Sequence, residues 1–381
     1  MNAIPWMQLA LRLAKRGFGK TSPNPMVGAV LVKAGKSIGQ GYHHRAGKPH
    51  AEIEALRDAA RRGHSPHGAT LFVTLEPCCT QGRTPPCTEA LIDAGIRSVV
   101  VGATDPNPKH RGEGFSILRQ AGIRVESGVL AEQCSQLNEA FNHWIIARTP
   151  FVTVKAAMTL DGKIATAAGE SKWITGDKAR RKAMRLRLGS DAVLVGVNTI
   201  LADDPALTLR SVSGFGNKRL RRIILDSGGR IPPLARVLGD EHAELTTVVV
   251  TTATASKRVK ALSERVQVWV SPEAASKDGQ RPDLRWLLQK LGSEGVTSVL
   301  VEGGGEVNAS FLLGGFAHRV AFFYAPKIIG GRKARRGVAG MGASDWGEIP
   351  RITGIGWKTL GPDLLMTGAL DYSQAPRRKN P

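Results

Sequence analysis

Short apolar runs typical of buried strands alternate along the chain with segments whose apolar side chains recur at helical spacing. Residues 26–32 and 69–75 are continuous β-rich runs, whereas residues 51–62 place Ile53, Leu56 and Ala60 on one helical face. Further strands are predicted at 37–42, 98–101, 151–158, 192–195, 222–226, 246–251, 266–270, 298–302 and 320–324, and further helices at 6–14, 86–94, 114–121, 130–146, 178–188, 282–291 and 306–313. This alternation predicts an α/β layered fold, because sheets and helices that follow one another pack as layers.

The length and one short segment predict the domain organisation. A chain of 381 residues is long enough for two or three domains at about 150 residues each. Arg148, Thr149 and Pro150 precede a new strand and form a boundary between two α/β domains. We therefore predict one domain over residues 1–147, a second over 150–370, and a disordered basic tail over 371–381.

The chain lacks the features of membrane and secreted proteins. No window holds about 18 consecutive apolar residues, so no transmembrane helix is predicted. Arg12 and Lys15 interrupt the apolar N-terminal segment, and no small-residue cleavage site follows it. Three of the four cysteines fall between residues 78 and 87, a spacing that favours a metal site over a disulfide scaffold. These observations predict a protein of the reducing cytoplasm.

The net charge is strongly positive but unevenly distributed. The formal charge of +21 suits a nucleic-acid binder, a binder of phosphorylated small molecules, or a basic surface. Residues 1–147 carry 17 basic and 11 acidic side chains, whereas residues 148–381 carry 36 basic and 21 acidic side chains. Most of the excess therefore lies outside the half that contains the cysteine cluster. Within it, Arg180, Arg181 and Arg185 are expected to form a solvated helix face.

One histidine, one glutamate and two cysteines have the pattern of a catalytic zinc site. His50 and Glu52 open a predicted helix, Cys78 follows a predicted strand, and Cys87 opens the next helix. An imidazole and two thiolates suit zinc and leave a fourth position for water, while Glu52 can carry a proton from that water to a departing amine. The arrangement is the mark of zinc nucleobase deaminases, although the second cysteine here follows an eight-residue insert. A structural zinc, or free thiols beside a core histidine, remain alternatives, and Cys79 could compete with Cys78.

Several motifs resemble the deaminase domain of the bifunctional riboflavin-biosynthesis deaminase/reductase family. They are TSPNPMVG at 21–28, AGKPHAE at 46–52, TLEPC at 74–78 and GRTPPC at 82–87. The resemblance implies a cytidine-deaminase-like three-layer domain in which His50, Cys78 and Cys87 bind Zn²⁺ and Glu52 is catalytic. Thr80 stands where family members usually have a histidine that could hold substrate. Asn24 is a candidate contact to the base or ribose.

The second half resembles the reductase domain of the same family. A strand at 298–302, three glycines at 303–305 and a helix form a turn at which backbone amides can approach a phosphate. With the segments KAAMTLDGK, GESKWIT and NTILADDPALTLR, this turn implies a dihydrofolate-reductase-like domain that uses NADPH. The resemblance implies cofactor contacts at Ala157, Trp173, Thr199, Asp203, Ser227, Gly304, Gly305, Glu306, Val307, Asn308, Ala309 and Ser310. It implies substrate contacts at Ser171, Arg187, Leu207, Arg210 and Glu302. Arginine guanidinium groups can bind a sugar phosphate through two hydrogen bonds.

The combined patterns predict a two-step enzyme of riboflavin formation. Zinc-dependent hydrolysis would remove an amine from 2,5-diamino-6-(5-phosphoribosylamino)pyrimidin-4(3H)-one, and NADPH would then reduce its ribosyl side chain to ribityl. The alternatives are a nucleic-acid base deaminase with a basic appended domain, and a non-catalytic zinc protein that binds nucleic acid. We expect a cytoplasmic homo-oligomer that acts on a small phosphorylated pyrimidine and binds neither nucleic acid nor membranes.

Overall fold

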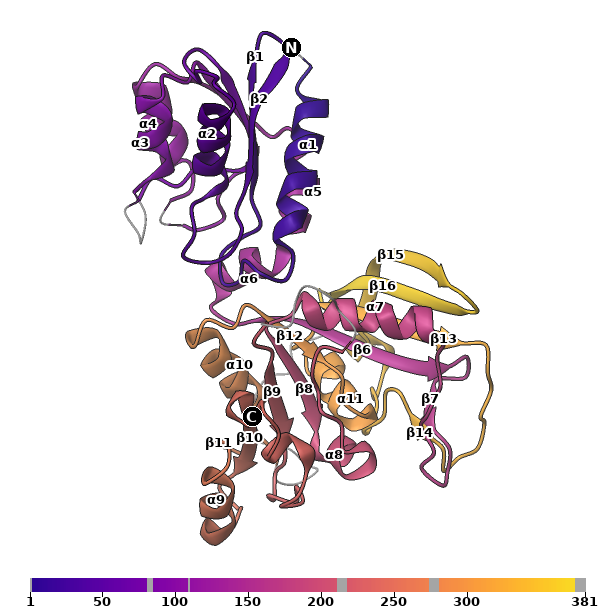
Figure 1. Cartoon of the computed structure of the whole chain (residues 1–381). Helices are drawn as coiled ribbons and strands as arrows, with labels where there is room; N and C mark the ends of the chain where they lie inside the picture. The colour runs from indigo at the N-terminus through magenta and orange to yellow at the C-terminus, as the bar shows by residue number, and fades with distance from the viewer. Residues whose placement is uncertain (1, 81–84, 109, 211–217, 274–280, 374–381) are drawn as a thin grey trace. The chain divides into compact units, whose positions relative to one another are not determined.

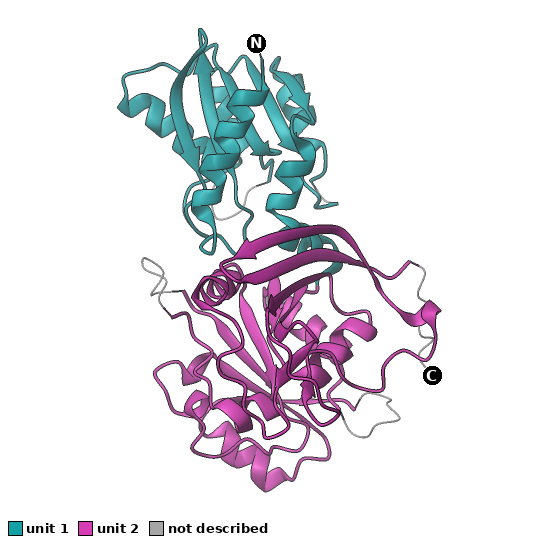
Figure 2. Ribbon diagram, turned by 90° about the vertical axis from the view of Figure 1, so that its right-hand side faces the viewer, with its two compact units in different colours: residues 1–148 teal, residues 149–381 magenta. Residues whose placement is uncertain are grey.

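The chain folds into two compact units, residues 1–148 and 149–381 (Figure 2). The structure is a computed structural model that describes residues 2–80, 85–108, 110–210, 218–273 and 281–373. Within these ranges, no helix is both long enough and apolar enough to cross a bilayer. The tail predicted at 371–381 falls mainly on residues 374–381, outside the described ranges, whereas Asp371 is the last residue of a strand.

Unit 1 is a three-layer α/β/α sandwich. Its sheet has the order β2-β1-β3-β4-β5, formed by Lys36–Tyr42, Gly28–Lys33, Thr70–Leu75, Ser98–Ala103 and Arg124–Ser127. Helices α2 (Ala51–Arg61), α3 (Cys87–Asp93) and α4 (Glu113–Gln120) cover one face, and α1 (Ile4–Ala14) and α5 (Ala131–Leu137) cover the other (Figure 1). β3, β4 and β5 run parallel, so the segments that follow β3 and β4 leave the sheet at the same edge.

The predicted helix over 130–146 is wrong as a single element. The structure has α5, and then α6 (Glu139–Ala147), with Asn138 between them. The buried Asn138 side chain accepts a hydrogen bond from the Met26 backbone N–H at 2.8 Å and donates to the Met26 carbonyl at 2.9 Å. Apolar residues continue at helical spacing across the break, although no residue of α6 is buried, and so the pattern alone does not reveal it.

Unit 2 contains a larger sheet with helices on both faces. Its described strands have the order β11-β10-β9-β8-β12-β6-β13-β16-β15, parallel from β11 to β13 and antiparallel beyond. In that order they are Gln267–Ser271, Thr246–Thr251, Arg221–Leu225, Ala192–Gly196, Ser298–Val301, Phe151–Thr159, Arg319–Ala325, Asp363–Asp371 and Arg351–Leu360. β7 (Lys163–Ala165) and β14 (Arg335–Arg336) form a separate pair.

The two faces of this sheet have separate apolar cores. Helices α10 (Leu284–Ser293) and α11 (Gly305–Leu313) pack on one face. Helices α7 (Asp177–Leu188), α8 (Val197–Asp203) and α9 (Ser256–Ser263) pack on the other. The sequence patterns missed α8, α9 and the β15–β16 hairpin. Gly354, Gly356 and Gly368 interrupt the β-rich composition of that hairpin, and α8 and α9 are too short for a clear helical period.

Candidate active sites

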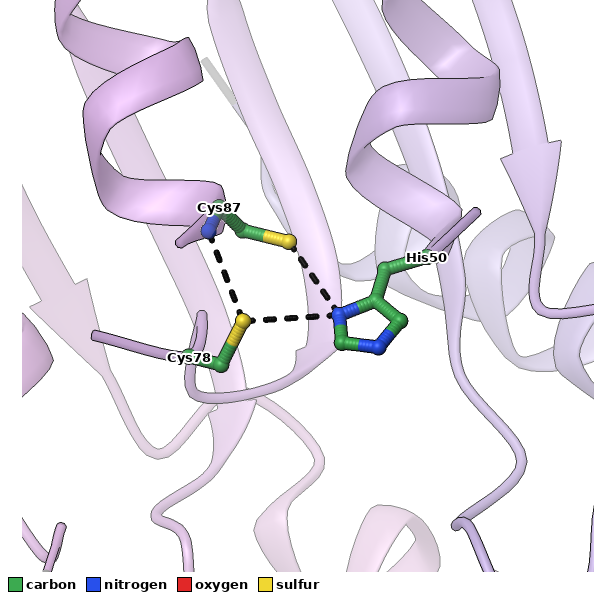
Figure 3. Close-up of side chains that lie close together, drawn as sticks. All are labelled: His50, Cys78 and Cys87. Atoms are coloured by element: carbon green, nitrogen blue, oxygen red, sulfur yellow. Dashed lines mark hydrogen bonds between the residues drawn. The ribbon is translucent and has the colours of Figure 1, made fainter. Parts of the chain in front are cut away.

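The predicted zinc ligands come from the starts of two helices and from the loop after β3. His50 is the extended residue directly before α2, and Cys87 is the first residue of α3. Cys78 lies three residues beyond the end of β3. The three side chains point toward one another (Figure 3). The structure thus brings together residues that the sequence separates by up to 37 positions.

The distances within this cluster fit one tetrahedral metal ion. Nδ1 of His50 lies 3.4 Å from Sγ of Cys78 and 3.3 Å from Sγ of Cys87. Zinc bonds of about 2.3 Å to sulfur and about 2.0 Å to nitrogen, at a tetrahedral angle, separate the two ligand atoms by about 3.5 Å. The backbone N–H of Cys87 also donates to Sγ of Cys78 at 3.4 Å. Two thiols and an imidazole so placed can bind zinc and leave one coordination position open.

The pKa values of the two thiols in the cluster are shifted in opposite directions. A hydrogen bond from Cys87, together with one from His50, lowers the pKa of Cys78 to about 4. The hydrogen bond with Cys78 and the burial of the side chain raise the pKa of Cys87 above its usual range. The surroundings of Cys78 thus favour its thiolate, the form that binds a metal.

Glu52 lies in the first turn of α2, buried beside these residues. Its side chain is 3% exposed, and its Oε2 has no hydrogen-bond partner among the described residues. Burial, together with the charge of Cys78, raises the pKa of Glu52 to about 7. A buried carboxylate with an unpaired oxygen is costly unless a ligand or water satisfies it. This oxygen is therefore available to a reacting molecule.

Three features lie near the cluster: the contact between Asn24 and His43, the thiol of Cys79, and the buried thiol of Cys134. Nδ2 of Asn24 lies 3.1 Å from Nε2 of the buried His43, whose Nδ1 lies 3.1 Å from the carbonyl of Pro49. Sequence reasoning did not assign His43 to the site. Cys79 contacts Glu113 rather than the cluster, and Cys134 is buried in the core. Cys79 therefore does not take the place of Cys78.

The residues predicted for the reductase site all line one cleft of about 3050 Å³ in unit 2. Those predicted for the cofactor are Ala157, Trp173, Thr199, Asp203, Ser227, Gly304, Gly305, Glu306, Val307, Asn308, Ala309 and Ser310. Those predicted for the substrate are Ser171, Arg187, Leu207, Arg210 and Glu302. Which of them contact which ligand stays a prediction.

The glycine-rich turn brings backbone close to the cleft wall at the start of α11. Gly304 is the extended residue before the helix, and Gly305 is its first residue. A Cβ at Gly305 would lie 2.3 Å from the carbonyl oxygen of Arg336, so no larger residue fits. The first amides of the helix lack intrahelical partners and can bind an anionic group.

Three charged side chains form a buried network in the cleft. Arg187 donates from Nε and Nη2 to the two carboxylate oxygens of Glu302, at 2.7 and 3.0 Å, and from Nη1 to the carbonyl of Thr208 at 2.9 Å. Lys155 Nζ lies 3.6 Å from the same carboxylate. Burial works against the ionised carboxylate, but the two cations outweigh it and lower the pKa of Glu302 to about 2. Arg187 thus directs its guanidinium toward Glu302 before any substrate phosphate binds.

Ser171, Arg210 and Arg180 also line the cleft, in different surroundings. The hydroxyl of Ser171 donates to Asp203 at 3.0 Å, whereas Arg210 is exposed. Arg180, predicted to lie on a solvated helix face, has a side chain that is 36% exposed. Its guanidinium lies 4.5 Å from the centre of the Trp173 ring and donates to the carbonyl of Thr175. Helical spacing alone does not show which loop packs against a helix face.

Comparisons with known proteins match each half of the chain to a family. The family profile of the cytidine and deoxycytidylate deaminase zinc-binding region matches residues 2–103, and that of the RibD C-terminal domain matches residues 150–366. The chain is 41% identical over 372 residues to the riboflavin biosynthesis protein RibD of Actinobacillus pleuropneumoniae, covering 98% of this chain and 95% of that protein. It is 48% identical over 361 residues to RibD of Aquifex aeolicus, covering 95% of this chain and 96% of that protein.

Solved structures also match nearly the whole chain, two of them as follows. RibD of Acinetobacter baumannii superposes with a TM-score of 0.84 at 36% identity, covering 97% of this chain and 99% of that one. The second structure is a diaminohydroxyphosphoribosylaminopyrimidine deaminase/5-amino-6-(5-phosphoribosylamino)uracil reductase from Thermotoga maritima. It superposes with a TM-score of 0.80 at 36% identity, covering 97% of this chain and 99% of that one. The predicted fold class, a cytidine-deaminase-like domain followed by a dihydrofolate-reductase-like domain, is confirmed.

Proposed function

The chain belongs to the RibD family of riboflavin-biosynthesis proteins, and we propose that unit 1 deaminates and unit 2 reduces the same phosphorylated pyrimidine. The chain is a bifunctional deaminase and reductase that uses zinc and NADPH. The substrate proposed for the first step is 2,5-diamino-6-(5-phosphoribosylamino)pyrimidin-4(3H)-one. The observation that carries the proposal is the cluster of His50, Cys78 and Cys87 beside the buried, unpartnered oxygen of Glu52.

In the deaminase step, His50, Cys78 and Cys87 would hold the zinc ion. Zinc, when bound, makes water a nucleophile at neutral pH. Glu52 takes a proton from the attacking water on its Oε2 and delivers it to the amine that leaves the pyrimidine carbon. The protein around Glu52 excludes bulk water, because the carboxylate is buried between α2 and the cysteine segments.

In the reductase step, the cleft of unit 2 holds both ligands. NADPH, when bound, would supply the hydride that, together with a proton, converts the opened ribosyl carbon to ribityl. The start of α11 at Gly304 and Gly305 would bind a phosphate of the cofactor. Arg210 would bind the substrate phosphate, because its guanidinium is exposed at the cleft, while Arg187 holds the Glu302 carboxylate in place. We propose that Arg187 acts on the substrate mainly through Glu302.

The test of the deaminase proposal is the variant Glu52→Gln. It should release no detectable ammonia from the diaminopyrimidinone ribosyl phosphate, because the amide cannot carry the proton. Zinc content and NADPH-dependent reduction of the deaminated compound should stay at the wild-type level. Products are identified by mass, with and without NADPH. Glu54→Gln is the matched control, since Glu54 lies on the same helix and pairs with Arg57. Deaminase activity retained by Glu52→Gln would contradict the role of Glu52.

The assembly and the compartment are also proposals. We propose a cytoplasmic homo-oligomer that does not bind nucleic acid. The exposed side chains of Ile355, Trp357 and Leu364 on β15 and β16 support self-association, because β15 is the edge of its sheet and these apolar groups face solvent. The match of residues 150–366 to a reductase domain gives the basic half a function other than nucleic-acid binding. Light scattering of the full chain and RNA binding at several salt concentrations test these points.

A further inference from the structure

A second cluster of metal-ligand side chains lies beside the zinc site of unit 1. Cys79, His110 and Glu113 place one sulfur, one ring nitrogen and one carboxylate oxygen within 4.8 Å of one another. Cys79 is adjacent in sequence to Cys78, but the two thiols have different partners. Sγ of Cys78 contacts His50, whereas Sγ of Cys79 lies 3.7 Å from Oε2 of Glu113. The two clusters therefore share no ligand.

The fold holds the second cluster together through one buried carboxylate. Glu76, in the segment that follows β3, accepts hydrogen bonds from the backbone N–H groups of Asp105 at 3.0 Å, Gly112 at 3.1 Å and Gly114 at 3.1 Å. These bonds tie the loop between β4 and α4 to the segment that carries Cys79. His110 stands on that loop and Glu113 is the first residue of α4, and the Glu113 N–H donates to the carbonyl of His110 at 3.0 Å. The backbone that carries all three ligands is thus anchored before any cation binds.

The distance between Cys79 and Glu113 and the unpartnered ring nitrogen of His110 both fit a bound cation. A tetrahedral zinc ion with bonds of about 2.3 Å to sulfur and about 2.0 Å to oxygen separates those two atoms by about 3.5 Å, close to the distance between Cys79 and Glu113. Nδ1 of His110 is buried, and it has no hydrogen-bond partner among the described residues. A buried polar nitrogen without a partner is unfavourable, and a metal ion is one means of satisfying it.

We propose that Cys79, His110 and Glu113 bind a second divalent cation of the zinc type, separate from the ion of the deaminase site. A thiolate, an imidazole and a carboxylate together suit zinc better than magnesium or calcium, which prefer oxygen ligands alone. The ion would join the loop between β4 and α4 to the segment after β3. This site does not depend on the proposed function, because none of its ligands takes part in deamination.

The experiment is zinc stoichiometry of the full-length protein. The protein is dialysed against buffer with micromolar free zinc, and bound zinc per chain is measured by mass spectrometry of the metal. Wild type should hold two equivalents, and Cys79→Ser, His110→Ala and Glu113→Gln should each hold one. The remaining equivalent, at His50, Cys78 and Cys87, reports that unit 1 is folded. Glu89→Gln, an exposed acid on α3, is the matched control and should hold two.

Two results would overturn the proposal. One equivalent in wild type would mean that the second cluster does not bind zinc at this concentration. Two equivalents retained by any one of the three ligand variants would mean that the second ion is bound elsewhere. If His110→Ala holds no zinc because unit 1 has unfolded, the conservative variants Cys79→Ser and Glu113→Gln decide between these outcomes. Deaminase activity is measured in parallel and should persist in Glu113→Gln, so failure of this site is distinguishable from failure of the proposed function.

Discussion

Replacing Glu302 with Gln should destabilise unit 2 by about 3 kcal/mol at pH 7. The carboxylate is 9% exposed and lies between Arg187 and Lys155, and its pKa falls from 4.5 to about 2 in the folded protein. Each pKa unit corresponds to about 1.4 kcal/mol, so this shift contributes about 3 kcal/mol to the free energy of unfolding. The figure agrees with the cost of about 3–5 kcal/mol that is typical when one partner of a buried ion pair is removed, here leaving the guanidinium of Arg187 without its counter-charge.

The stability difference between wild type and Glu302→Gln depends on pH, because the pKa of Glu302 is lower in the folded protein than in the unfolded chain. Because the folded-state pKa of Glu302 is depressed, its contribution is complete above pH 4.5 and is lost as the pH falls through about 2. The gap between wild type and Glu302→Gln should therefore shrink to about 1.5 kcal/mol near pH 3. Urea unfolding followed by tryptophan fluorescence measures it, since five of the seven tryptophans lie in unit 2.

Two further variants make the result decisive. Glu294→Gln removes a carboxylate that pairs with Arg221 at the surface, where both side chains are more than a quarter exposed, and should cost about 1 kcal/mol or less. Arg187→Met combined with Glu302→Gln should be less destabilising than the sum of the single changes by about 2 kcal/mol, because no uncompensated guanidinium remains. Additive effects of the two single changes would refute the buried pair, and would leave Arg187 free to bind a phosphate directly.

Two other changes test the packing of unit 1 and the cleft of unit 2. Gly28→Ala should lower the free energy of unfolding by about 2–3 kcal/mol, because its Cβ would lie 2.0 Å from the carbonyl oxygen of Ala10 on α1. Calorimetry of this variant beside Gly239→Ala, where nothing lies within 4 Å, measures the effect, and equal melting temperatures would contradict it. Arg210→Ala should raise the Michaelis constant for the ribosyl phosphate about tenfold while that for NADPH changes little, since a charge-assisted hydrogen bond to phosphate is lost. An unchanged Michaelis constant would remove Arg210 from the phosphate site.

The alternation of strand and helix patterns predicted the layered α/β architecture. The residue types His, Glu and Cys predicted the chemistry of the deaminase site. Strand and helix periods depend on local backbone geometry, so residues 51–62 and 69–75 reveal their structure without knowledge of their neighbours. The sequence also placed His50 and Cys87 at helix starts and Cys78 after a strand, and the resemblance to the deaminase family implied that the three would meet at a zinc ion. The limits of α2 and β3, Ala51–Arg61 and Thr70–Leu75, agree closely with those expectations.

Contacts between segments distant in sequence could be decided only by the tertiary structure. Asn138 breaks a periodic helix because Met26, 112 positions away, supplies both of its hydrogen-bond partners. Arg187 looked like a phosphate ligand, yet Glu302, 115 positions away, takes two of its donors. Cys79, His110 and Glu113 belong to no common sequence motif, and the carboxylate of Glu76 brings their segments together. The sequence by itself therefore determined which elements form and which ligand types are present. The fold decided which partner satisfies each polar group, because a side chain buried away from water must bind whatever donor or acceptor the packing places beside it.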